Sequence, residues 1–158
     1  MTEFRVRARR TERGAAAVEF ALVIPIFLVL VFGVIQYGLY FFAMQTGTTA
    51  VGDATRRMSV GDCQTEAQVK SFIHSHLGSA TTAGSASGIT IVTRTYTKAD
   101  GTGSVASPGE IGGTVTLTAT FPTLNLNFPL IPVPGDGVVT RSATARVEDI
   151  TASSVGAC

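Results

Sequence analysis

The feature that most constrains the fold of this chain is an apolar run close to its N-terminus. From Phe20 to Met44 there is no charged residue, and Gln36 is the main polar interruption. As an α-helix this run would be roughly 37 Å long, enough to cross about 30 Å of hydrocarbon with some tilt. A cleavable secretory signal has a shorter apolar core, about 7–15 residues, followed by a small-residue cut site. The residues after Met44 offer no such site, so we expect a retained single-pass transmembrane helix over 15–44.

Charges before the run set its expected orientation. The first 13 positions contain two acids and five of the 12 basic residues: Arg5, Arg7, Arg9, Arg10 and Arg13. Basic residues beside a membrane span favour the cytoplasmic side. We therefore predict a basic cytoplasmic leader over 1–14 and an exported C-terminal part. Beyond residue 44 the charges are scattered singly, which argues against a nucleic-acid-binding surface.

After the apolar run the sequence pattern indicates two further helical segments. Residues 45–62 are expected to form a helical stem, frayed because Gly47, Gly52 and several threonines have low helix propensity, with a break at 62–64. A second helix is predicted over 65–77, since Thr65 and Gln68 form a capping-box pattern and Gly78 supplies a stop. Apolar residues lie at helical spacing within it: Val69, Phe72, Ile73 and Leu77.

Period-two alternation then predicts three strands, over 88–97, 112–121 and 137–149, although Arg141 interrupts the apolar face of the last. Asp100-Gly101 is a turn signal after the first strand. The expected fold class is α+β: one long N-terminal transmembrane helix followed by a small exported head over 63–158. We expect the head to consist of one helix on a three- to four-stranded antiparallel sheet, with the 65–77 helix on one face and water on the other.

An unusual segment, residues 121–137, separates the last two predicted strands. Its four prolines, Pro122, Pro129, Pro132 and Pro134, exclude a central strand. Its other residues are strongly apolar and include Leu124, Leu126, Phe128, Leu130, Ile131 and Val133. Two interpretations remain open. The segment is either a buried loop folded over the sheet edge or an exposed apolar contact for a partner subunit or for the membrane surface.

Two cysteines, Cys63 and Cys158, are expected on the exported side, where disulfides persist. A bridge between them would contribute ~4–5 kcal/mol in the chain-entropy model and would fix the C-terminus; the alternative is two unpaired thiols. His74 and His76 lie near Cys63 in sequence, but residues two apart on a helix point in nearly opposite directions. We therefore expect no metal site and no cofactor. Without a hydrolase, metalloprotease or phosphate-binding motif, we do not expect an enzyme.

The start of the apolar run carries a carboxylate, Glu19. One interpretation is an interfacial glutamate without a specific role, which the nearby helix N-terminus would tolerate. However, Gly14 followed by four residues, then Glu19, an aromatic residue and an apolar helix resembles the type IV prepilin processing signal. The resemblance implies that a prepilin peptidase cuts between Gly14 and Ala15. The new amine of Ala15 would then pair with Glu19 of a neighbouring subunit, which would select one axial register.

The string "RGAAAVEFALVIPIFLVLVFGVIQYGLYFF" at 13–42, followed by "AVGDATRRMSV" at 50–60, is similar to the TadE-like family of the tight-adherence pilus machinery. The matching positions are Arg13, Gly14, Val18, Glu19, Phe20, Ala21, Pro25, Phe32, Gly33 and Gly38. Processed members often have Tyr after the glutamate, where this chain has Phe20, and some members stay uncleaved. The β-rich part fits the family only loosely.

This resemblance implies a minor pilin or pseudopilin of a tight-adherence (Flp-type) pilus that takes part in pilus assembly and adhesion. The implied location is the inner membrane, single-pass, with the N-terminus cytoplasmic and the C-terminus periplasmic or extracellular, or within the pilus itself. The implied partners are prepilin peptidase, the major pilin, other minor pilin-like subunits and the assembly platform proteins. The alternative is an uncleaved, membrane-anchored accessory protein of this secretion-related apparatus.

Pro25 interrupts the predicted span. A proline inside a helix removes one hydrogen bond, here to the carbonyl of Ala21, and is expected to kink or locally melt the helix. Neighbouring helices or side chains can compensate for that loss in a membrane. Pro25 is thus either a tolerated kink or a flexible point that helps a subunit to leave the bilayer.

Overall fold

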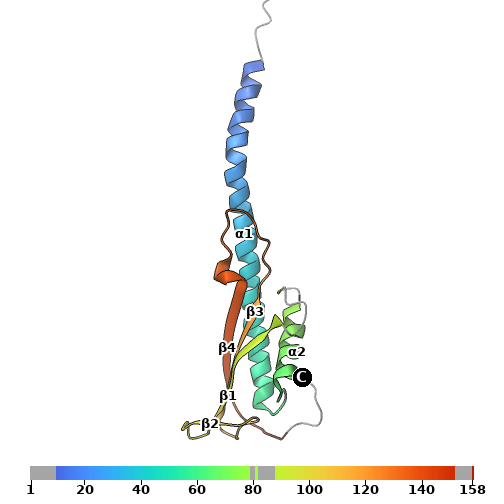
Figure 1. Ribbon diagram of the computed structural model, residues 1–158, viewed down its shortest axis with the longest axis vertical. Helices are drawn as coiled ribbons and strands as arrows, with labels where there is room; N and C mark the ends of the chain where they lie inside the picture. Colours follow the sequence, from blue (N-terminus) through green and yellow to red (C-terminus); the bar gives the residue numbers. More distant parts are fainter. Residues whose placement is uncertain (1–9, 79–80, 82–87, 152–157) are drawn as a thin grey trace, which may run out of the picture.

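The computed structural model describes residues 10–78, 81, 88–151 and 158, and the side chains from residue 14 onward. The elements are α1 (Arg10–Ser59), α2 (Glu66–Leu77), β1 (Thr90–Thr97), β2 (Ser104–Val105), β3 (Thr114–Pro122), the 3-10 turn η3 (Pro134–Gly137) and β4 (Val138–Arg146). The molecule is elongated: the N-terminal half of α1 projects alone, and all other elements pack around its C-terminal half (Figure 1). The predicted α+β fold class, with a long apolar helix before a small helix and an antiparallel sheet, is confirmed.

The expected fraying of the stem does not occur, because α1 is helical without a break from Arg10 to Ser59. Packing against the rest of the head outweighs the low helix propensity of this stretch. One face of it is fully buried, through Ala50, Val51, Ala54 and Met58. Gly47 also has a packing role there, since a Cβ at this position would lie 1.9 Å from Cζ of the buried Phe121 ring. The helix ends at Ser59, close to the expected break.

The sheet has the order β2-β1-β3-β4, and all neighbouring strands are antiparallel. The strand alternation is confirmed, with the apolar side chains of β3 buried and its threonines on the outer face. On that face hydroxyls pair across strands, as between Thr116 and Thr144 at 3.0 Å and between Thr118 and Ser142 at 3.0 Å. The turn at Asp100-Gly101 also forms, and Gly101 N donates to Lys98 O at 3.0 Å.

The inner face of the sheet packs mainly on α1 and only slightly on α2. This differs from the sequence-based expectation, in which the 65–77 helix covered the sheet. The small residues of the stem allow the strands to approach α1 closely, and α2 packs beside α1 instead. The single core therefore joins the stem, α2 and the sheet, from Ala50 and Met58 to Val69, Leu117 and Val139.

The second helix forms as predicted, with a complete capping box between Thr65 and Gln68. Its apolar side chains Val69, Phe72, Ile73 and Leu77 are all buried. Lys70 Nζ lies 2.7 Å from Glu66 Oε1, and this hydrogen bond holds the pKa of the Glu66 carboxyl below its ordinary value. The Arg57 guanidinium lies 4.8 Å from the centre of the Phe72 ring, which links α2 to the end of α1.

Candidate functional site

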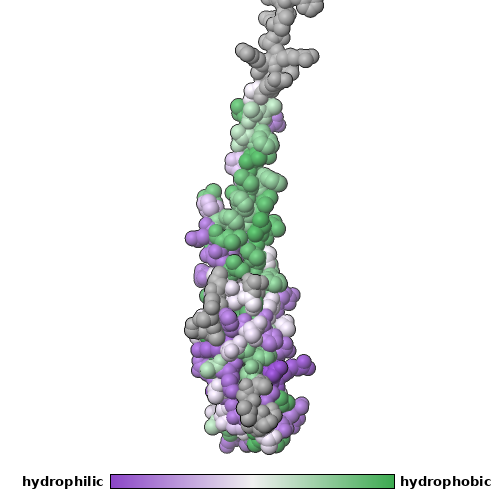
Figure 2. All heavy atoms as spheres, turned by 90° about the vertical axis from the view of Figure 1, so that its right-hand side faces the viewer, coloured by the Kyte–Doolittle hydropathy of each residue, from purple (hydrophilic) through white to green (hydrophobic). Residues whose placement is uncertain are grey.

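The sequence-predicted site residues lie on the exposed half of α1. Gly14, Ala15, Glu19 and Pro25 are all exposed on the N-terminal part of α1. Large apolar side chains cover this half, and Phe20, for example, is 67 % exposed. Figure 2 shows the hydrophobic surface concentrated on the projecting half of α1 and the hydrophilic surface on the head. By length and composition Gly14–Ser59 contains a candidate membrane span, the one such helix among the described residues.

Ala15 and Glu19 are four residues apart on α1 and therefore lie on the same face, one turn from each other. Gly14 has open space around it, since a Cβ there would have no neighbour within 4 Å. Exposure of the Gly14–Ala15 bond leaves it sterically accessible at the end of the projecting helix. Processing at this bond and pairing through Glu19 remain predictions, because both depend on other molecules.

The helix passes through Pro25 without interruption, so of the two expected effects of this proline, a kink or local melting, the melting does not occur. A kink at this position remains a prediction.

A contact that the sequence did not reveal joins the apolar half of α1 to the head. Gln36 is only 2 % exposed. Its Nε2 donates to Leu124 O at 3.2 Å, and its Oε1 accepts from Leu126 N at 3.1 Å. The side-chain amide of Gln36, the polar interruption of the apolar run, is therefore hydrogen-bonded to the backbone of the proline-rich segment, as buried amides require.

We call residues 123–137 the β3–β4 loop. The loop is closed at its base, where Thr123 N donates to Gly137 O at 2.8 Å. It extends along α1 and does not fold over the sheet edge (Figure 1). Phe128 stacks on Phe32 with ring centroids 4.4 Å apart. Beyond this pair, Leu130 borders an apolar cavity of about 330 Å³ together with Pro25, Ile26, Val29 and Leu30 of α1.

The predicted disulfide between Cys63 and Cys158 is present, with the two Cα atoms 5.2 Å apart. It fixes the C-terminal residue beside the break that follows α1. The preceding segment is also held there, since Glu148 N donates to Ser59 O at 2.8 Å. Nearby, hydrogen bonds from the side chain and the backbone N–H of Thr151 lower the pKa of Asp149. The disulfide and the bond to Ser59 thus hold the C-terminal segment to the base of the stem.

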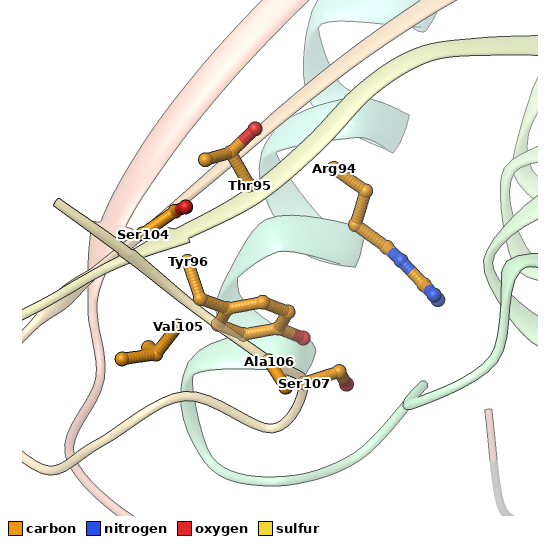
Figure 3. A pocket seen from close by; sticks show the side chains of 7 residues that line it. All are labelled: Arg94, Thr95, Tyr96, Ser104, Val105, Ala106 and Ser107. Carbon is orange, nitrogen blue, oxygen red and sulfur yellow. The ribbon is translucent and has the colours of Figure 1, made fainter.

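The sheet edge carries a polar cavity of about 300 Å³, lined by Arg94, Thr95, Tyr96, Ser104, Val105, Ala106 and Ser107 (Figure 3). Tyr96 is 2 % exposed, and within the described part of the chain its hydroxyl has no hydrogen-bond partner. Arg94 extends from the same strand, and its Nη1 donates to Gln64 O at 2.8 Å.

The location of the Arg141 side chain, on β4, became known only from the structure. Its side chain lies on the inner side of the strand and borders a cavity of about 430 Å³ with Phe41, Met44, Gln45 and Thr48 of α1. Its Nη1 donates to Thr140 O at 3.1 Å, which keeps the guanidinium partly satisfied beside the helix. The break in the apolar pattern of β4 was the sequence signal for this position.

The comparison with known families gives a result for the N-terminal part. Residues 14–56 match the family model described as TadE-like protein. This segment is TadE-like. The resemblance found in the sequence is confirmed over these residues. No curated protein and no solved structure matches the chain. The TadE-like segment covers the projecting half of α1 and most of the stem, so it includes Gly14, Glu19, Gln36 and Gly47.

Proposed function

We propose that this chain is a minor pilin or pseudopilin of a tight-adherence pilus, anchored in the inner membrane through the projecting half of α1. The observation that carries the proposal is the combination of Gly14 and Glu19 at the start of an exposed apolar helix within the TadE-like segment. The head lies at the other end of that helix. An arrangement of this kind leaves one half of α1 available for a bilayer or for packing among other pilin helices.

In this proposal a prepilin peptidase cuts between Gly14 and Ala15 and removes the basic leader. The new α-amino group, with a pKa of about 8, is mostly positive at neutral pH. Glu19 of a neighbouring subunit then neutralises it in a bundle of helices. An unpaired carboxylate in that apolar interior is costly, so the pair fixes the axial register between subunits.

The partners in this role are the prepilin peptidase, the major pilin, other minor pilin-like subunits and the assembly platform proteins. The chain acts through packing and pairing and has no catalytic function. The second candidate is an uncleaved accessory protein of the same apparatus. It is favoured by Phe20, where processed members of the family often have Tyr.

Replacement of Gly14 by leucine is expected to abolish removal of the leader, because a bulky side chain obstructs the peptidase at the bond it cuts. Mass spectrometry of the chain produced together with a prepilin peptidase measures the loss of residues 1–14. Gly38→Leu is the matched control, because Gly38 is also an exposed helix glycine with open space around it, and it should leave cleavage intact. A wild-type chain that stays intact from residue 1 would overturn the processing proposal and favour the accessory protein.

Replacement of Glu19 by alanine is expected to abolish piliation while the protein level stays unchanged, because the amine of Ala15 loses its partner. Electron microscopy of cell-surface pili and immunoblotting of membranes measure the two effects. Glu12→Ala is the control, since this carboxylate leaves with the leader in the proposed processing. Normal piliation by the Glu19→Ala variant would contradict the pairing role.

A further inference from the structure

We propose that the β3–β4 loop inserts its apolar tip into the bilayer leaflet on the side of the head, as a second membrane contact beside α1. This inference rests on the proposed membrane span and specifies how the head meets the membrane.

The loop follows α1 in steps toward the membrane. Near its end, Gly135 lies so close to Tyr40 that a Cβ there would be 2.8 Å from the tyrosine hydroxyl oxygen. The next contacts along the helix are the two hydrogen bonds of Gln36 and then the stacking of Phe32 on Phe128. Farthest along the helix, Leu130 borders an apolar cavity together with Pro25, Ile26, Val29 and Leu30. Leu130 is therefore the tip of the loop.

Helix geometry places this tip within the hydrocarbon. If the apolar layer begins beside Ala15, about 30 Å of hydrocarbon at 1.5 Å per residue ends about 20 residues later, near Ile35. Gln36 then lies at the boundary, where the loop backbone satisfies its amide. The α1 residues that line the cavity beside Leu130, residues 25–30, lie roughly 7–15 Å inside it. The contacts of the loop thus change from polar to apolar at the expected depth.

The composition of the loop suits this position. No charged residue occurs between Glu110 and Asp136. Pro129 and Pro132 flank the tip and have no backbone N–H, so they remove donors that would be costly to leave unpaired in lipid. Ile131 N donates to Phe128 O at 3.4 Å, which satisfies a further donor. Leu130 itself is 88 % exposed, an unfavourable state for leucine in water and a favourable one in hydrocarbon.

Continuity with α1 identifies the occupant as lipid. The cavity beside Leu130 is lined by apolar side chains of the helix surface that the span itself presents. A surface formed jointly by the loop and the span faces the same surroundings as the span, which in an isolated subunit is the bilayer.

The chain has no tryptophan, so a single introduced one reports its own surroundings. The full-length Leu130→Trp variant is reconstituted at low protein density in phosphatidylcholine vesicles that contain acyl-chain-brominated lipids. We expect blue-shifted emission and strong quenching by the bromines. Leu126→Trp, at the level of Gln36, should be quenched less by deep bromines than Leu130→Trp. Formation of the Cys63–Cys158 bridge, read as gel mobility without reductant, verifies that each variant has folded.

Two control positions separate failure of this inference from failure of the proposed span. Leu22→Trp lies on the projecting helix and should be quenched, whereas Ile111→Trp should not. Ile111 is 61 % exposed and precedes β3, a strand of nine residues that puts it about 30 Å from the base of the loop.

Three outcomes overturn the proposal. Water-like, unquenched emission from both Leu130→Trp and Leu126→Trp, with Leu22→Trp quenched, refutes loop insertion and leaves the span intact. Blue-shifted but unquenched emission that grows with protein density indicates a second copy of the chain as the occupant. Lack of quenching of Leu22→Trp refutes the span and with it this inference.

Discussion

Replacing Gly47 by alanine is expected to destabilise the head by about 1–3 kcal/mol, although alanine is the better helix former by about 1 kcal/mol. The added Cβ would lie 1.9 Å from Cζ of Phe121, a ring that is fully buried between the sheet and α1. Neither the helix nor β3 can shift freely, because neighbouring side chains on both are also buried. Thermal or urea unfolding of the full chain in detergent, followed by circular dichroism, measures the effect.

Gly52→Ala is the matched control for this prediction. It lies on the same helix with nothing within 4 Å of its added Cβ, so it should stabilise the protein by about 0.5–1 kcal/mol. In a double variant that combines Phe121→Leu with Gly47→Ala, the loss of stability should be smaller than the sum of the losses in the two single variants. The reason is that the smaller side chain leaves room for the methyl group. Equal effects of the two glycine substitutions would contradict the close approach of Phe121 to Gly47.

Replacing Cys63 and Cys158 together by serine is expected to lower the free energy of unfolding by about 2–5 kcal/mol. The bridge joins positions 95 residues apart, so it restricts a large part of the unfolded chain. The same unfolding measurement, made with and without reductant, gives the effect.

The reductant provides the control within the same experiment. It should destabilise the wild-type chain by the amount that the double substitution does and should leave the double variant unchanged. A wild-type melting temperature that does not respond to complete reduction, verified by thiol labelling, would contradict a stabilising role for the bridge.

The sequence was sufficient for features whose physical causes are local. The capping box of Thr65 and Gln68 and the alternation of β3 depend on neighbours within a few residues, and both formed as predicted. The element that covers the sheet was not predictable in this way. The buried face of the stem consists largely of small side chains such as Ala50 and Ala54, which give a weak apolar signal.

In the candidate site, too, the features with local causes were predictable and the long-range contact was not. Gly14, Ala15 and Glu19 were found from their spacing and from the family resemblance, and the structure adds their exposure. The role of Gln36 could not be found, because its partners Leu124 and Leu126 are 88 and 90 residues away in the chain. In sequence Gln36 is only a polar interruption of an apolar run. Its structural role depends on the β3–β4 loop, whose backbone presents one hydrogen-bond acceptor, Leu124 O, and one donor, Leu126 N.

The unbroken course of α1 has a mechanical consequence. A helix of 50 residues is about 75 Å long, and it enters the core of the head without a hinge. Because Phe121 lies directly over Gly47, the sheet cannot slide along the helix without a collision. An axial pull or rotation applied to the helix between Pro25 and the head is therefore transmitted to the head. Over this part of the chain, the stem and the head move as one rigid unit.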